Sequence, residues 1–247
     1  MNRAIRATIA MAALLAAAAV ARPIGAAPQA GLLAQARASL GGEAKLSGVK
    51  ALQLTGQKRT RFNMMRRGVR SAEYQTEGEE IRMLFPDHYL IVADNRTIPG
   101  LGGSREGFAG AAVIGEGVVG KWRNPETFGY LALALLLRSD TVFPFTPKAH
   151  APGTLTFADP AGVIVTVDLD PKTSRPLRLR FDAPLRANDG TPRGGTVPTR
   201  IELSDFRQTG GLMLPHTLAR FQGGDLITEQ TFASIIVNPP LTRADFK

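Results

Sequence analysis

The sequence predicts a mainly β protein, built on a curved antiparallel sheet with one apolar face and accompanied by short helices. From residue 153 to residue 240, short runs of alternating apolar and polar residues are separated by Pro, Gly and Asp. In the clearest run, 163–169, three valines and a leucine alternate with Ile164, Thr166 and Asp168. Alternation with a period of two, bounded by turn residues, is typical of strands that are buried on one face.

The first 26 residues have the layout of a secretory signal peptide. Arg3 and Arg6 precede an uncharged, alanine-rich core, and small residues follow around Ala26, as a cleavage site requires. A membrane-spanning anchor is the alternative, but it needs roughly 20 apolar residues, which is more than this core provides. We therefore expect export, a removed signal peptide at residues 1–26 and a single mature domain at residues 27–247.

Composition limits the classes of function. The chain has 30 Lys and Arg against 21 Asp and Glu, so an exported protein of this charge would be attracted to anionic membrane surfaces or acidic glycans. Nucleic acid is not an expected partner, because export separates the protein from most of it. The chain has no Cys, which excludes disulfides, thiolate metal ligands and lipidation of an N-terminal Cys.

The N-terminal part combines one short helix with strands. Residues 30–40 favour a helix that ends at a Gly-Gly pair, and residues 49–60 alternate as a strand with Leu52 and Leu54 on one face. Residues 81–93 predict a hairpin that turns at Pro-Asp-His.

Residues 61–75 are harder to interpret, because four arginines surround Phe62, Met64 and Met65. One interpretation is a long basic hairpin or loop. The other is a membrane-facing patch, in which basic residues lie near anionic lipid and apolar residues insert.

A glycine motif at residues 115–120, Gly-Glu-Gly-Val-Val-Gly, matches the spacing of the dinucleotide-binding fingerprint. The fingerprint needs a helix that opens directly after it and a surrounding βαβ unit. We expect neither, because residues 121–125 separate the motif from the next predicted helix. No nucleotide cofactor is therefore expected.

That next helix is predicted to begin with Asn124 as its N-cap and Pro125 at its first position. Residues 128–137 are apolar on nearly every face but too short to span a bilayer. Such a helix is usually buried in a core, and beside a curved sheet it could also act as a lid over the concave side. Residues 141–152 contain three prolines and predict a linker or flap.

The C-terminal part continues the sheet. Residues 184–198 predict a long polar loop, and residues 199–206, 214–221 and 226–237 predict the last strands.

No catalytic or metal-binding pattern is present in the sequence. The three histidines, His88, His150 and His216, have no second ligand at metal-binding spacing, and no Ser lies in a G-x-S-x-G motif. Asp168 and Asp170 form a carboxylate pair, but the Asp-Pro turn explains Asp170 better than catalysis does. We expect a protein that is not an enzyme and that has no metal and no cofactor.

Several turn motifs, taken in order, resemble those of exported bacterial proteins of the LolA-like superfamily. The matching segments are Ala38–Ala44, Phe85–Tyr89, Gly107–Gly110, Asp170–Pro176, Gly211–Pro215, and Val237–Leu241 with Phe246. The resemblance implies an unclosed half β-barrel of roughly eleven strands covered by a lid of short helices. It also implies a periplasmic protein whose apolar concave face holds acyl chains. In the lipoprotein carriers of this superfamily an arginine in the cavity ties the lid to the sheet, and no single arginine here is assigned that role.

The leading hypothesis is therefore a carrier or binding protein for a lipid or lipoprotein acyl chain, held between the sheet and the lid. The predicted lining residues are Leu52, Leu54, Met83, Phe85, Phe128, Leu131, Leu135, Val165, Val167, Leu179, Phe181, Leu203 and Leu218. The alternative is that these residues form a hydrophobic core and bind no ligand, since burial is usual for apolar side chains. A second hypothesis is an interaction or sensor module of the envelope with a sealed core.

Overall fold

The structure is a computed structural model that describes residues 29–66, 69–94, 103–115, 118–148, 151–186 and 192–247. The expected signal peptide and His150 lie outside the described residues.

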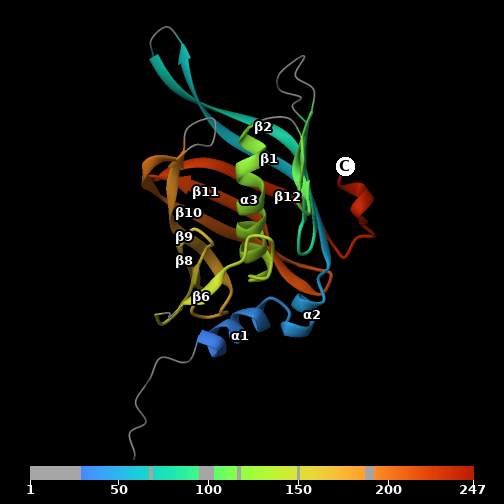
Figure 1. Ribbon diagram of the computed structural model, residues 1–247. Helices are drawn as coiled ribbons and strands as arrows, with labels where there is room; N and C mark the ends of the chain where they lie inside the picture. Colours follow the sequence, from blue (N-terminus) through green and yellow to red (C-terminus); the bar gives the residue numbers. More distant parts are fainter. Residues whose placement is uncertain (1–28, 67–68, 95–102, 116–117, 149–150, 187–191) are drawn as a thin grey trace, which may run out of the picture.

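One twelve-stranded sheet forms the scaffold (Figure 1). Its order is β5-β4-β3-β2-β1-β12-β11-β10-β9-β8-β7-β6, and neighbouring strands pair antiparallel. The strands are β1 Ala51–Arg66, β2 Val69–Leu84, β3 His88–Asp94, β4 Ser104–Ala109, β5 Ala112–Ile114, β6 Thr146–Lys148, β7 Thr154–Ala158, β8 Ile164–Leu169, β9 Pro176–Arg186, β10 Pro192–Thr209, β11 Leu212–Gln222 and β12 Asp225–Val237. Because β5 and β6 lie at opposite edges, the sheet does not close, and Figure 1 shows that it is curved. This confirms the predicted mainly β half-barrel.

The last strand pairs with the first and joins the two halves of the sheet. β12 runs antiparallel to β1, from the pair Leu52–Val237 to the pair Thr60–Thr228. The register shifts at Gly56, where a β-carbon would lie 2.0 Å from the carbonyl oxygen of Thr231. Only glycine allows the two backbones to approach this closely, and such irregularities bend a sheet locally.

In the described part of the chain, three α-helices accompany the sheet: α1 Gln29–Ser39, α2 Glu43–Ser47 and α3 Val118–Leu136. A 3-10 turn, η1 Arg243–Asp245, follows the last strand. In Figure 1, α3 stands on the concave side of the sheet, and α1 and α2 lie at its lower end. Within the described residues, none of the helices combines the length and hydropathy needed to cross a membrane.

Two predictions around α3 are wrong. The helix begins at Val118, so Asn124 is not its N-cap and Pro125 lies in its interior. It also opens inside the glycine motif, contrary to our expectation, although the strands around it are antiparallel and form no βαβ unit. The physical reason is tertiary: burial of the following apolar turns stabilises a helix that local cap and proline signals would have started later.

The predicted loop at 184–198 is also wrong in extent. β9 continues to Arg186 and β10 begins at Pro192, with Pro184 paired to Thr196. Gly194 and Gly195 have φ values of 74° and 76° and lie where the register shifts, so they form an irregular step within the strand that the sequence predicted as a loop.

Residues 61–75 form a hairpin, because β1 and β2 remain paired as far as Arg66 and Val69. This confirms the first interpretation of the segment. Arg61 forms an ion pair with Asp225, with 2.6 Å between Nη1 and Oδ2. The side chains of residues 62–72 lie outside the described part, so the membrane-facing patch stays a prediction.

Candidate functional site

The predicted apolar lining lies on the concave face of the sheet and on the helix that covers it. Twelve of the thirteen predicted residues are buried in one continuous core, with exposed fractions between 0 and 7%. The thirteenth, Phe85, is half-buried and packs against that core. The predicted residues therefore lie together in the core, and their role in ligand binding stays a prediction.

Direct cross-strand pairs build this face. Leu52 lies opposite Met83. Val167 lies opposite Leu179, and Leu203 lies opposite Leu218. Side chains opposite each other in antiparallel strands point to the same side of the sheet, so each pair presents two apolar groups to α3.

Helix α3 is buried on every side over its last turns. Each residue from Phe128 to Leu137 is buried, and both Leu131 and Leu135 belong to the core. Aromatic contacts fix the helix to the sheet: the ring of Phe128 lies 5.4 Å from that of Phe85, and Tyr130 stacks at 4.4 Å on Phe181. The predicted lid is thus the central element of the core in this conformation.

The first part of the predicted flap packs against α3, whereas residues 146–148, predicted as linker, form the edge strand β6 by pairing with β7. Phe143 and Phe145 both contact the ring of Tyr130, with centroid distances of 6.1 and 5.3 Å. The hydroxyl of Tyr130 donates a hydrogen bond to Oδ2 of Asp159 at 3.4 Å, and burial together with this carboxylate raises the pKa of the phenol. The segment after α3 is therefore a packed strap between the helix and the edge of the sheet.

A polar cluster, formed by Lys58, Glu77, Glu79 and Gln230, interrupts the apolar concave face. The ammonium group of Lys58 lies 3.0 Å from Glu77 and 3.6 Å from Glu79, and the amide of Gln230 donates to Glu79 at 2.6 Å. Glu79 is only 4% exposed, and burial raises the pKa of its carboxyl group against the opposing effect of Lys58. Sequence reasoning missed this cluster, because charged residues in an alternating strand are expected on the outer face.

The hydroxyl of Tyr89 is buried nearby. It has no hydrogen-bond partner among the described residues, and burial, Glu79 and Glu106 all raise its pKa. Its ring packs against Phe108 and Phe128. The concave face thus offers one polar group, as well as the polar cluster, beside its apolar surface.

Two arginines hold the C-terminal end of α3. Nη1 of Arg37 on α1 donates to the carbonyl of Leu137 at 2.8 Å, and Nη1 of Arg138 donates to the carbonyl of Val49 at 2.7 Å. The guanidinium of Arg138 also lies 4.4 Å from the ring centre of Phe85. These residues were not predicted, because their partners are remote in the sequence.

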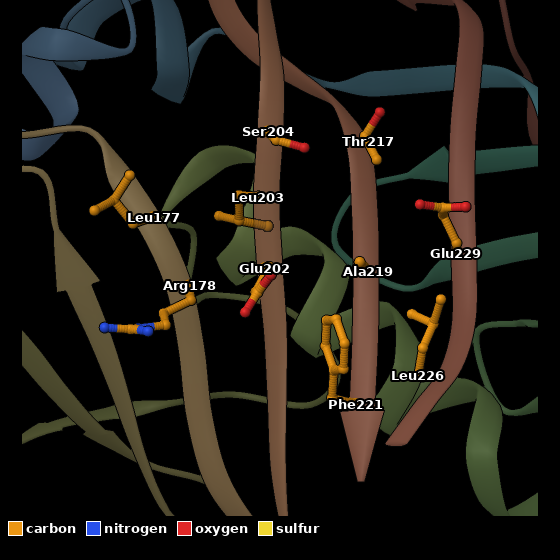
Figure 2. A pocket seen from close by; sticks show the side chains of 10 residues that line it. All are labelled: Leu177, Arg178, Glu202, Leu203, Ser204, Thr217, Ala219, Phe221, Leu226 and Glu229. Carbon is orange, nitrogen blue, oxygen red and sulfur yellow. The ribbon is translucent and has the colours of Figure 1, made fainter. Parts of the chain in front are cut away.

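Two hollows stand out on the described residues, and neither lies between α3 and the concave face. The larger, of about 450 Å³, lies on the convex face over β9 to β12. Figure 2 shows Arg178, Glu202 and Glu229 along it, with the green ribbon of α3 behind the sheet. The smaller, of about 300 Å³, lies between α1, α2 and the end of α3.

Two of the histidines have structural partners. Nδ1 of His88 lies 2.8 Å from Asp87, and Nδ1 of His216 lies 2.7 Å from the carbonyl oxygen of Phe232. Within the described ranges, no group of three or more His, Cys, Asp or Glu could hold a metal ion.

No protein family model matches the chain, and no curated protein matches its sequence. The structure is similar to that of a LolA superfamily protein from Nitrosomonas europaea, with a TM-score of 0.52 and 11% identity over 90% of this chain and 98% of that one. Lower scores are found for a domain assigned to outer-membrane lipoprotein sorting in Vibrio parahaemolyticus (TM-score 0.47, 15% identity, 87% and 94% covered) and for a DUF1329 family protein from Desulfovibrio piger (TM-score 0.43, 8% identity, 89% and 97% covered). At these identities the likeness concerns the fold.

Proposed function

We propose that this chain, which has a LolA-like fold, is an exported periplasmic carrier or binding protein for the acyl chain of a lipid or lipoprotein. The observation that carries the proposal is the apolar part of the concave face, whose residues form one core cluster with a single apolar helix that covers it. The sheet and the helix each bury an apolar surface, and an acyl chain could pack between these two surfaces. We propose binding and not catalysis, by one domain at residues 27–247 after removal of residues 1–26.

Ligand entry requires α3 to move away from the sheet. An acyl chain between them would replace helix contacts with its own, gaining about 0.8 kcal/mol for each buried CH₂ group. A chain of ten or more such groups would therefore offset several lost side-chain contacts. The strap with Phe143 and Phe145 packs on the helix and is the contact that such a movement would break or stretch.

A second function is favoured by a specific observation. Because every residue of α3 from Phe128 to Leu136 is buried, the same fold could also be a sealed interaction or sensor module of the envelope. In that case the concave face is only a core, and partners would meet the outer surface or an anionic membrane.

Organic extraction of protein purified from its native host, followed by mass spectrometry, separates the two functions. The carrier hypothesis expects an extractable acyl lipid, or the acyl chain of a lipoprotein, in a fixed ratio to the protein. Fluorescent fatty-acid titration of delipidated protein should then show saturable binding. No extractable lipid together with no saturable binding would favour the sealed module.

A further inference from the structure

The smaller hollow, at the lower end of the sheet, is lined by two arginines. It lies between α1, α2 and the end of α3, measures about 300 Å³, and has Arg37 and Arg138 on its wall beside Leu33 and Leu46. This volume is at the lower end of the range for small-molecule sites. Leu46 belongs to the same buried core as the concave face, so the hollow adjoins apolar surface.

The two guanidinium groups are held in the same way. Each uses Nη1 to donate to a backbone carbonyl, that of Leu137 for Arg37 and that of Val49 for Arg138. Each presents Nε and Nη2 to one carboxylate: Arg37 to Glu43, with 3.0 Å from Nη2, and Arg138 to Asp140, at 2.7 and 3.0 Å. The carbonyl bonds therefore fix both guanidiniums, independently of the carboxylates.

The arginine side chains are much less exposed to solvent than the carboxylates that they pair with. The arginine side chains are 14% and 16% exposed, whereas those of Glu43 and Asp140 are 68% and 70% exposed. Exposed ion pairs are weak, so either carboxylate can turn into solvent at little cost. The paired Nε and Nη2 donors that remain match the oxygens of a phosphate group as well as those of a carboxylate.

We propose that this hollow binds the phosphate group of an anionic lipid headgroup, with Arg37 and Arg138 donating to its oxygens and Glu43 and Asp140 displaced into solvent. Two fixed positive charges suit a phosphate, and two bidentate forks fix its orientation. This inference rests on the proposed carrier function for the placement of the acyl chains, which would pass Leu33 and Leu46 toward the core. The phosphate site itself does not depend on it.

Calorimetric titration with three soluble probes tests the proposal: dihexanoyl phosphatidylglycerol, dihexanoylglycerol, which lacks the phosphate, and glycerol 3-phosphate, which lacks the acyl chains. Asp140→Asn and Glu43→Gln remove the competing carboxylates and should each raise the affinity for both phosphate probes by about two- to fivefold, because the weak ion pair no longer has to be broken. Arg37→Gln and Arg138→Gln should each lower it by about tenfold, the worth of one charged hydrogen-bonding group. The affinity for dihexanoylglycerol should not change.

Asp205→Asn and Arg207→Gln are matched controls, because this pair has the same two-bond geometry, at 3.0 and 2.6 Å, but its side chains are 40% and 52% exposed outside the hollow. No response to Asp140→Asn and Glu43→Gln, an equal response of the controls, or no binding of either phosphate probe would overturn the phosphate site. The carrier function fails separately if dihexanoylglycerol does not bind and the lipid binds no tighter than glycerol 3-phosphate. In that outcome, glycerol 3-phosphate binding that responds to Asp140→Asn would retain the site for a free phosphate.

Discussion

Gly129 of α3 lies directly against the side chain of Phe143 in the strap that follows the helix. A β-carbon at Gly129 would lie 2.7 Å from Cδ1 and 2.9 Å from Cβ of Phe143. Only a hydrogen atom fits there, so the absence of a side chain at Gly129 is what allows the strap to close over the helix.

Gly129→Ala should therefore destabilise the protein, although alanine is the better helix former. We expect a loss of about 1–3 kcal/mol in the free energy of unfolding, as for other overpacked core sites, measured by urea denaturation. Gly31→Ala in α1 is the matched control, because no atom lies within 4 Å of its added β-carbon. It should be neutral or stabilising, and an equal loss in both variants would contradict the packing argument.

Truncation of the buried face of α3 tests the core. Leu131 and Leu135 lie one turn apart and are 7% and 0% exposed. Leu131→Ala and Leu135→Ala should each lower the free energy of unfolding by roughly 2–5 kcal/mol, and the double variant need not be additive. Ile164→Ala, at a residue that is 50% exposed, should change it little.

The same variants address the carrier function. If α3 shares its apolar face with a ligand, the double variant should also bind a fluorescent fatty acid more weakly under conditions where circular dichroism shows a folded sheet. Full stability of the double variant would mean that the helix does not pack in solution as described.

The inner face of the sheet was predictable because one-sided burial fixes the register. A slip of one residue would have placed Leu52, Val167 or Leu203 in solvent, so the alternation alone identified them. Leu177 lies two positions before the buried Leu179, so alternation alone would place it on the inner face; the register shifts near Leu169 and Pro176, and its side chain is 39% exposed.

The polar contacts that could not be predicted from the sequence join residues that are far apart along the chain. Arg37 and Leu137 are 100 positions apart, and Glu79 and Gln230 are 151 apart. Local patterns carry no information about such pairs. The start of α3 was predicted at the wrong residue for a different reason. The Asn-Pro pair is a strong local signal for a helix start, but tertiary packing extends the helix beyond it.

Export can be checked by intact-mass analysis of protein from the native host. The basic start at Arg3 and Arg6 and the alanine-rich core predict that residues 1–26 are removed. The mature protein should begin at Ala27, and a chain that still begins at Met1 would contradict the prediction.

Pro125 should weaken α3, because it lies inside the helix and has no N–H for the hydrogen bond to the preceding turn. Pro125→Ala is expected to raise the free energy of unfolding, by up to about 3 kcal/mol if the helix is otherwise regular there. Thermal unfolding measures the gain. Pro171→Ala, in the exposed turn after β8, is the control and should bring no gain; a decrease for Pro125→Ala would show that the proline is needed where it lies.

Glu79 should make stability fall as the pH rises. Burial raises the pKa of its carboxyl group in the folded state above the ordinary value of 4.5, so the folded protein binds the proton more tightly than the unfolded chain. Stability from this group is therefore fully present below pH 4.5 and is lost as the pH rises through the folded pKa. The groups that interact with it include Lys58, Glu77, Gln230 and the hydroxyl of Tyr89.

Urea unfolding of wild type and Glu79→Gln across pH 3 to 8 isolates this effect, because the difference between the two proteins cancels the titrating groups that do not interact with Glu79. We expect wild type to lose stability relative to the variant as the pH rises above 4.5, and the difference to level off once the folded carboxyl is ionised. Asp168 acts in the other direction and at lower pH: burial would raise its pKa, but hydrogen bonds from Arg180 and Arg178 lower it below 3.8, so its contribution is lost only in stronger acid. Wild type gaining stability over Glu79→Gln as the pH rises would mean that Lys58 and Gln230 outweigh burial, and that the polar cluster stabilises the ionised carboxylate.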